Sequence, residues 1–316
     1  MKSLLGYACT CVAAITIASP ASADHVYLAL GDSSAYGETN RTLDPSNGDR
    51  GYVAPFADYL ATQNGGVRPT VLNLAINGET SASFFAGTGR VSSDGQGFNT
   101  NYVGRPDPFP QYQELLSRNA GFVANGDQVT TVTVQFGANN LDGAASNPAF
   151  LLLTPQQQQA AIQGILAQFQ ADYVNILGTV RSLYPTADVY AIGYHNPYNG
   201  DLSLPISALA DPAVQGLNQV IAGVGAAFGA KYVDFYSAIH PNEASLTLIG
   251  TYATDPVNYV HLNDQGYAAA SQALIATATP DPVSVPAPPA LVLGVVGFVA
   301  LAGRRVRVSR KTSCPA

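Results

Sequence analysis

The chain has 316 residues, of which 47% are hydrophobic and only 11% are charged. This composition supports a substantial core and excludes a disordered chain. The segment from Asp24 to Asp281 holds all 21 acidic residues but only eight of the 14 basic ones, a net charge of −13. So acidic a segment argues against nucleic acid as a partner.

The first 23 residues are typical of a secretory signal peptide. Lys2 supplies the basic start, an apolar stretch follows, and Ala21-Ser22-Ala23 ends the segment with small residues suited to cleavage. We therefore expect residues 1–23 to be removed and the mature chain to begin at Asp24. All cysteines lie outside the expected mature domain, at Cys9, Cys11 and Cys314. That domain is thus predicted to have no disulfide framework, no thiol nucleophile and no cysteine-ligated metal.

The middle of the chain, residues 24–276, alternates short apolar runs with longer helical patterns. The apolar runs predict strands at His25–Leu30, Thr70–Leu74, Val129–Phe136, Asp188–Gly193 and Lys231–Phe235. The longer patterns predict helices at Pro155–Leu183, with Thr154 as N-cap, at Asp211–Phe228 and at Gln265–Thr277. Short, continuous apolar strands separated by helices are the signature of a parallel sheet covered on both faces. We therefore expect one three-layer α/β/α domain with a five-stranded, mainly parallel sheet.

Residues 81–126 are predicted to form a long loop within this domain. The segment is rich in glycine, asparagine and serine, with scattered phenylalanine and tyrosine. Only Pro110–Ser117 has a pattern that favours a short helix. We expect this loop to roof a cleft.

The C-terminal end has three parts. Residues 277–289 are rich in proline, alanine, threonine, valine and serine, as an extended linker would be. Residues 290–303 then run for 14 residues without a charge, and a cluster of arginine and lysine follows. Counted from Val285, the apolar run reaches 19 residues, close to the roughly 20 that a spanning helix needs. We expect residues 290–316 to form a membrane anchor or sorting tail with its basic end held in the cytoplasm.

This tail resembles the PEP-CTERM sorting signal of exported proteins in Gram-negative-type bacteria, over about the last 30 residues. It departs from that signal at Ala287, because Val285-Pro286-Ala287-Pro288 lacks the usual glutamate between the prolines. The resemblance implies membrane targeting, processing by an exosortase-type enzyme, and a location on the cell surface or in the extracellular matrix.

Polar motifs follow the predicted strands at the points where a parallel sheet binds its ligands. They are Gly31-Asp32-Ser33 after the first strand, Asn77-Gly78-Glu79 after the second and Gly137-Ala138-Asn139 after the third, with His261 before the last helix. A hydroxyl that attacks a carbonyl, an imidazole that takes its proton and donors that hold the oxyanion make an acyl-transfer site. No pair of histidines has metal-ligand spacing, and we expect neither a metal nor a cofactor.

These four segments, in this order, resemble the four sequence blocks of the SGNH (GDSL-type) hydrolases, a family of serine esterases and lipases. The resemblance spans Val26 to about Leu274 and implies a flavodoxin-like fold. It also implies that Ser33 is the nucleophile and His261 the general base. The oxyanion hole would consist of the backbone N–H groups of Ser33 and Gly78 and the side-chain amide of Asn139. Glycine suits such a position because it allows a close backbone approach.

Two positions depart from the family's pattern. Asn140 stands where the third block usually has an aspartate, and Asn258 stands where an aspartate usually precedes the histidine by three residues. In a serine protease, the analogous change from aspartate to asparagine lowers turnover by about 10⁴. Asp255, six residues before His261, is the expected orienting acid if its segment bulges. Asn258 or a backbone carbonyl is the alternative, and some members of such families work as Ser-His dyads.

Three other polar residues are given structural roles. Asp32 is expected to fix the turn through backbone N–H groups, although it neighbours Ser33. His240 follows the fifth strand but lacks the Gly266-Tyr267 pair that follows His261, so we do not expect it to be the base. His195 ends the fourth strand, where a packed or solvated loop histidine is favoured over one that lines the cleft.

The predicted function is an exported serine esterase that hydrolyses a small-molecule, lipid or polysaccharide ester through an acyl-enzyme. One alternative is a carbohydrate O-acetyl esterase that acts on exopolysaccharide. Another, favoured by Asn140 and Asn258, is a catalytically silent surface or matrix-binding protein that keeps the fold. Acyl transfer to a sugar or alcohol cannot be separated from hydrolysis at this level.

Overall fold

The computed structural model describes residues 24–40, 49–88, 102, 105–145, 147–204, 206–255 and 258–279. The expected signal peptide at residues 1–23, most of the linker and the tail at residues 290–316 lie outside these ranges. The chain divides into two compact units, Met1–Thr277 and Ala278–Ala316, and the fold is that of the first. Within the described ranges, no helix has the length and apolar character needed to cross a membrane.

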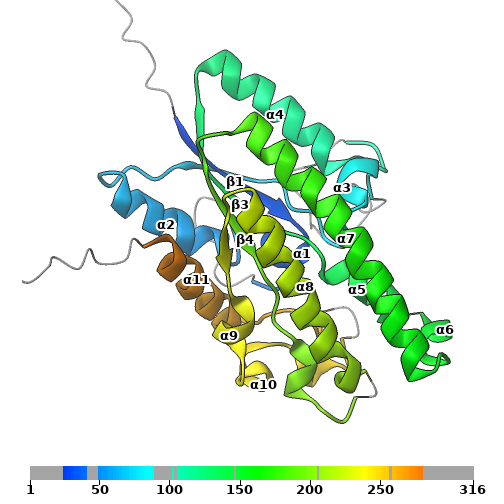
Figure 1. Cartoon of the computed structure of the whole chain (residues 1–316). Coiled ribbons are helices and arrows are strands. Elements are labelled where there is room, and N and C mark those ends of the chain that lie inside the picture. Colours follow the sequence, from blue (N-terminus) through cyan, green and yellow to red (C-terminus); the bar gives the residue numbers. More distant parts are fainter. Residues whose placement is uncertain are drawn as a thin grey trace, which may run out of the picture. The chain divides into compact units, whose positions relative to one another are not determined.

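A parallel sheet forms the centre of the first unit (Figure 1). Its described strands are β1 (His25–Gly31), β2 (Thr70–Asn73), β3 (Gln128–Gln135), β4 (Asp188–Ile192) and β5 (Lys231–Val233). They lie in the order β2-β1-β3-β4-β5, and all neighbouring pairs are parallel. This is the flavodoxin-like order, with its switch point between β1 and β3. The predicted three-layer α/β fold with five strands is confirmed.

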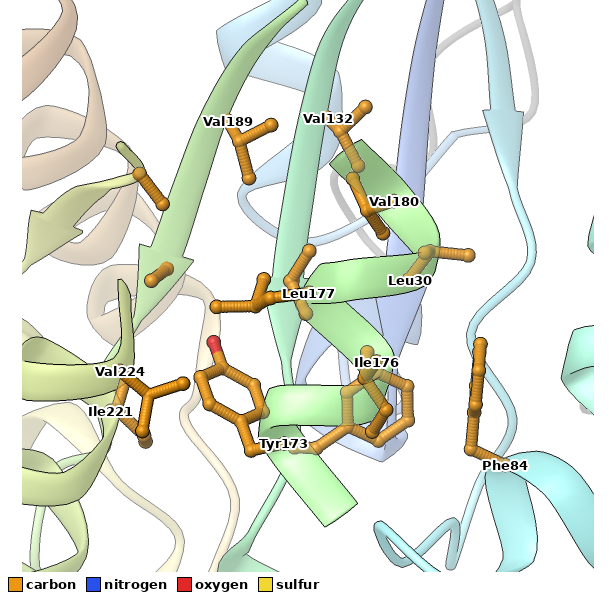
Figure 2. Packing of buried hydrophobic residues seen from close by; sticks show 14 of the residues in the cluster. Leu30, Phe84, Val132, Tyr173, Ile176, Leu177, Val180, Val189, Ile221 and Val224 are labelled. Atoms are coloured by element: carbon orange, nitrogen blue, oxygen red, sulfur yellow. The ribbon is translucent and has the colours of Figure 1, made fainter. Parts of the chain in front are cut away.

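One face of the sheet is covered by α4 (Gln111–Asn125), α7 (Pro155–Leu183) and α8 (Ser207–Ala227). Figure 2 shows strand residues such as Leu30 and Val132 packed against Leu177 and Val180 of α7, with Ile221 of α8 beside them. All of these side chains are fully buried. Burial of one such side chain contributes about 1.5–3 kcal/mol, so this layer is the main apolar core.

The opposite face is covered by α2 (Val53–Gln63), α9 (Phe235–Ile239) and α11 (Asp264–Ala278). Aromatic rings dominate the contact: Phe56 of α2 meets Tyr27 of β1 and Tyr190 of β4 edge to face, each at a centroid distance of 5.4 Å. Tyr52 meets Phe235 in the same manner at 5.3 Å. Successive strand residues point to opposite faces, which is why β1 supplies apolar groups to both layers.

The predicted elements differ from the observed ones mainly between β2 and β3. Helix α7 has the predicted bounds, and its capping box joins Thr154 and Gln157. Helix α4, however, extends for 15 residues to Asn125 and ends at Gly126. The prediction of a long loop with one short helix was therefore wrong there, because the polar stretch up to Asn125 is one exposed face of a helix. Helix α2 was not predicted.

Short helical elements connect these layers. They are α1 (Ser33–Tyr36), α3 (Ser83–Ala86), α5 (Ala138–Ala145), α6 (Pro148–Leu151), η2 (Pro197–Gly200), α10 (Glu243–Leu246) and η3 (Ile249–Thr251). Helices α1 and α5 each begin just after the carboxyl end of a strand, β1 and β3 respectively. Their first turns therefore lie at the switch point of the sheet.

Candidate active site

A cavity of about 460 Å³ is lined by residues that follow the carboxyl ends of β1, β2, β3 and β4. Ser33, Gly78, Asn139 and His261 all lie in its wall. Four residues that are far apart in the sequence are thus brought to one place, at the edge of the sheet where parallel α/β folds bind ligands.

Ser33 is the first residue of α1, directly after the turn that ends β1. At Gly31 the backbone has φ 153°, and an added Cβ would collide with the carbonyl oxygen of Gln135, so only glycine fits.

Asp32 caps the short helix, because its Oδ1 accepts the backbone N–H of Ser34 at 3.0 Å. Its Oδ2 accepts the hydroxyl of Tyr194 at 2.5 Å. Burial raises the pKa of Asp32 to about 7, against these hydrogen bonds. Asp32 therefore builds the turn that carries Ser33.

His261 faces the Ser33 hydroxyl. Its Nε2 lies 2.8 Å from Oγ of Ser33, and its Nδ1 lies 3.2 Å from the backbone carbonyl oxygen of Asn258. A carbonyl can only accept, so Nδ1 carries the hydrogen of the neutral ring and Nε2 accepts from Ser33. Burial lowers the pKa of His261 to about 4, while the Asn258 carbonyl and the charge of Asp255 act in the opposite direction. The ring is therefore a neutral base over a wide pH range.

The expected orienting acid, Asp255, acts through Asn258. The two Asp255 carboxylate oxygens accept the backbone N–H of Asn258 at 3.1 Å and its side-chain amide at 3.0 Å. The carbonyl of the same Asn258 accepts both the backbone N–H and Nδ1 of His261. Of the three alternatives left by the sequence, the backbone carbonyl is thus the one that meets the ring. Asp255 fixes that carbonyl and adds its negative charge at a distance.

Two consecutive asparagines hold the loop that carries Gly78. Asn139, in the first turn of α5, donates its side-chain Nδ2 to the carbonyl of Glu79 at 2.8 Å. Asn140 accepts the backbone N–H of Ser81 at 3.1 Å and donates to its hydroxyl at 2.9 Å. Gly78 itself has φ 79°, a left-handed conformation that favours glycine. The amide of Asn139 has a second hydrogen, and that hydrogen can be donated to an oxyanion.

Much of the remaining cavity wall is apolar and comes from α5, α6, α7 and α8, although Asp142 of α5 and Tyr198 of η2 also line it. It includes Leu141, Phe150, Ile162, Leu209, Val214 and Leu217. A polar end that holds the serine, the histidine and the amide donors thus adjoins a hydrocarbon-lined space. Such a cavity suits a substrate with an apolar group beside its reacting carbonyl.

Two further residues near the site were not assigned to it from the sequence. His195 lines the cavity and is buried, with Nε2 3.1 Å from the carbonyl oxygen of Val260; a cavity-lining role had been the less favoured one. Glu38 is 1% exposed, and its Oε2 lies 3.3 Å from Nε2 of His261. In the sequence, Glu38 could be noticed only as an acidic residue soon after the Gly31-Asp32-Ser33 motif. Its burial could not be predicted, because no local sequence pattern marks a buried carboxylate.

His240 lies elsewhere, stacked on the ring of Tyr236 with Nδ1 2.8 Å from the carboxylate of Glu243. It does not line the cavity. No group of three or more histidine, cysteine or acidic residues that could hold a metal ion occurs in the part of the chain that the structure describes.

Comparison with known proteins places this geometry in a family. The sequence profile of the GDSL-like lipase/acylhydrolase family matches residues 29–269, more than half of the chain. Among proteins with curated descriptions, none matches the chain in sequence.

Solved structures with the same fold include a lipase from a goat rumen metagenome, at 16% identity and a TM-score of 0.54 over 80% of this chain and 97% of that one. An extracellular lipase from Streptomyces rimosus has 18% identity and a TM-score of 0.53, over 81% of this chain and 100% of that one. A variant of an acetyl-xylooligosaccharide esterase from Geobacillus stearothermophilus has 14% identity and a TM-score of 0.51, over 82% and 96%. At such identities these structures share the fold. The profile match identifies the family: this chain belongs to the GDSL-like lipase/acylhydrolases, serine hydrolases that act on ester bonds.

Proposed function

We propose that this protein is an exported serine esterase that hydrolyses carboxylic esters through an acyl-enzyme on Ser33. The observation that carries the proposal is the 2.8 Å contact between Oγ of Ser33 and Nε2 of His261 inside the cavity. A hydroxyl bonded to an unprotonated imidazole nitrogen is an activated nucleophile. The same contact argues against a catalytically silent protein that merely keeps the fold.

The reaction would proceed in two halves. Oγ of Ser33 attacks the ester carbonyl while its proton passes to Nε2 of His261, and the developing oxyanion is held by the N–H groups of Ser33 and Gly78 and by Nδ2 of Asn139. The proton on Nε2 then goes to the alcohol as it leaves. Water, deprotonated by the same nitrogen, releases the acid and restores Ser33.

The apolar wall supports an ester whose acyl group is a hydrocarbon chain. Side chains such as Phe150, Ile162 and Val214 offer no hydrogen bonds to a sugar, while they can bury methylene groups at about 0.8 kcal/mol each. A lipid or small-molecule acyl ester is therefore the favoured substrate. The alternative, a carbohydrate O-acetyl esterase, would leave the apolar side chains of this wall unused.

Labelling with a fluorophosphonate probe tests the mechanism. Wild-type protein should be labelled, and Ser33→Ala should not; failure to label the wild type would overturn the proposal. A substrate panel then tests the acyl preference. We expect p-nitrophenyl octanoate to be hydrolysed with a higher kcat/KM than p-nitrophenyl acetate. Preference for acetylated xylan over both would instead establish the carbohydrate esterase.

Export is part of the same proposal and rests on the sequence of the two ends. Residues 1–23 have the pattern of a signal peptide, and residues 290–316 have that of a membrane-targeting tail that an exosortase-type enzyme could process. N-terminal sequencing and fractionation of the protein from a Gram-negative host test this. A mature protein that begins at Asp24 outside the cytoplasm is the expected result, and an unprocessed cytoplasmic chain would contradict it.

A further inference from the structure

Glu38 places a buried carboxylate at the nitrogen that carries the proton of the reaction. Its Oε2 lies 3.3 Å from Nε2 of His261, the same atom that Oγ of Ser33 meets at 2.8 Å. Glu38 is also tied to the nucleophile through the backbone, because its N–H donates to the carbonyl of Ser33 at 3.1 Å. The chain turns back sharply at Gly37, which ends α1 in the left-handed conformation with φ 76°, and this turn brings the Glu38 N–H to the Ser33 carbonyl.

The contact between Glu38 and His261 becomes attractive when the ring of His261 is protonated. At rest, the lone pair of Nε2 accepts the Ser33 hydroxyl, since the hydrogen of the ring is on Nδ1. When Oγ attacks a carbonyl, the Oγ–H bond breaks, the proton moves to Nε2 and the ring becomes a cation. A carboxylate 3.3 Å from Nε2 then stabilises the positive charge of the ring, and in a buried site that attraction is only weakly screened.

Other titratable groups lie around Glu38 and His261, and each of them interacts with a part of the pair other than the contact at Nε2. Asp255, from the loop before His261, acts on the Nδ1 side through Asn258. His195, at the end of β4, bonds the carbonyl of Val260, and burial lowers its pKa to about 4, with the charge of His261 adding to that effect. Tyr267 of α11 adjoins Glu38, whose charge adds to the effect of burial in raising the pKa of the phenol. Within the described ranges, Glu38 is the carboxylate paired with Nε2.

We propose that Glu38 is the counter-ion of the imidazolium that forms on His261 during acyl transfer. It would supply the negative charge that the family's pattern places at the position of Asn258 in this chain. The proposal rests on the proposed function, because it needs acyl transfer at Ser33. Glu38 takes up no proton: the proton from Oγ stays on Nε2 until the leaving alcohol receives it, and the carboxylate remains unchanged throughout.

Loss of this charge should affect rate and pH dependence together. Burial lowers the pKa of His261 to about 4, against the opposing effects of the Asn258 carbonyl and the charge of Asp255, and a negative charge beside Nε2 acts in the same direction as those two groups. In Glu38→Gln we therefore expect kcat to fall by about 10- to 100-fold, with KM little changed. The acid limb of kcat/KM, which reports the base in the free enzyme, should move to lower pH. A residue that only supported the loop would lower activity without moving this limb.

The experiment measures p-nitrophenyl octanoate hydrolysis by the full-length protein over about pH 3 to 9, a range that extends below the pKa of about 4 of His261. Wild type is compared with Glu38→Gln, with Glu38→Asp, which keeps the charge, and with Glu114→Gln. Glu114 is the matched control, a fully buried glutamate of α4 that is paired with Arg105 and Arg118. Its variant should lose thermal stability but keep the wild-type acid limb. Glu38→Asp should have a limb between those of the wild type and Glu38→Gln.

The outcomes separate the two proposals. Wild-type protein that is neither labelled by fluorophosphonate nor active would overturn the proposed function. Active wild type beside a Glu38→Gln variant with unchanged kcat and acid limb would overturn the counter-ion alone, as would a slower variant whose limb has not moved. If Glu38→Gln does not fold, the same outcomes are read from Glu38→Asp, whose shorter side chain weakens the contact with Nε2. An unchanged kcat and acid limb in Glu38→Asp would then overturn the counter-ion.

Discussion

The nucleophile side of the proposed active site is held by bonds to the backbone of the turn that follows β1. Gln111 of α4 bonds both backbone groups of Gly31, accepting from its N–H at 3.0 Å and donating to its carbonyl at 2.9 Å. The N–H of Asp32 donates to the carbonyl of Gln135 in β3 at 3.2 Å. Ser33 therefore sits on a turn whose backbone is held by two neighbouring elements, α4 through the Gln111 side chain and β3 through the Gln135 carbonyl.

The base side is held by both backbone and side-chain bonds, outside the sheet. His261 lies in residues 247–263, a segment outside the main sheet, in which Thr247 and Leu262 form an isolated bridge. The hydroxyl of Thr39 donates to the carbonyl of Leu262, and Asp255 holds Asn258. The comparison shows that the turn of the serine is bonded directly to a strand of the sheet, whereas the ring of the histidine is oriented by a loop carbonyl that Asp255 fixes.

The largest expected effect comes from the nucleophile side. Ser33→Ala should lower kcat by about a millionfold, the loss seen when a serine nucleophile is removed, while the free energy of unfolding changes little. Ester hydrolysis and urea unfolding measured on the same samples check this. His240→Ala, outside the cavity, serves as the control and should retain wild-type kcat. A Ser33→Ala variant with substantial activity would place the nucleophile elsewhere.

Asn139 joins the nucleophile side to the loop of Gly78. Its replacement should cause the next largest fall in kcat. Asn139→Ala removes the proposed oxyanion donor and should lower kcat by about 10²–10³. Asn140 bonds the same loop but is not expected to donate to the oxyanion, so Asn140→Ala should cost less than tenfold in kcat, with a comparable loss of thermal stability. Equal losses of kcat in the two variants would remove Asn139 from the oxyanion hole.

The two sides should respond to pH in opposite directions. On the nucleophile side, burial raises the pKa of Asp32 to about 7 and that of Glu79 to about 8. Their contribution to stability is complete below the unfolded values near 4 and is lost as pH rises through the folded ones. On the base side, burial lowers the pKa of His195 and His261 from 6.5 to about 4. Their contribution is complete above 6.5 and is lost as pH falls to about 4.

Of these four groups, the two carboxyls are the ones whose contribution to stability still changes above pH 6.5. The free energy of unfolding should therefore fall between pH 6.5 and pH 8. With about 1.4 kcal/mol per pKa unit, the loss is about 2 kcal/mol, most of it from Glu79. Urea unfolding at both pH values measures it. Glu79→Gln should remove most of the dependence, and an unchanged slope in that variant would assign the effect to other groups.

The smallest expected effect tests the base side. Asp255→Asn removes the charge that fixes Asn258 and should lower kcat about tenfold, the order of one hydrogen bond to a charged group. Stability should change less than in Asp32→Asn, because Asp32 is fully buried in the turn. Kinetics and thermal unfolding of both variants sharpen the comparison. A loss of kcat in Asp255→Asn as large as in His261→Ala would mean that Asp255 itself orients the ring.

The strands could be predicted because buried parallel strands are continuous apolar runs, and α7 because Thr154 and Pro155 mark its start. Helix α4 could not, because Asn119, Gly121 and Asn125 give its second half the composition of a loop. The grouping of Ser33, Gly78, Asn139 and His261 followed from strand order and motif order together. The carbonyl of Asn258 and the carboxylate of Glu38 did not, since a backbone acceptor has no residue signature and burial of Glu38 arises only from tertiary packing.

Leu217 belongs to two parts of the molecule at once. It lines the cavity, and it is fully buried in the core that α7 and α8 form over the sheet. Shortening it to alanine would make room for a bulkier acyl group, but a substitution of this kind costs about 2–5 kcal/mol of folding free energy. Substrate range and heat tolerance are therefore linked at this residue, and a variant that accepts larger esters through Leu217 should need a stabilising change elsewhere to survive the same temperature.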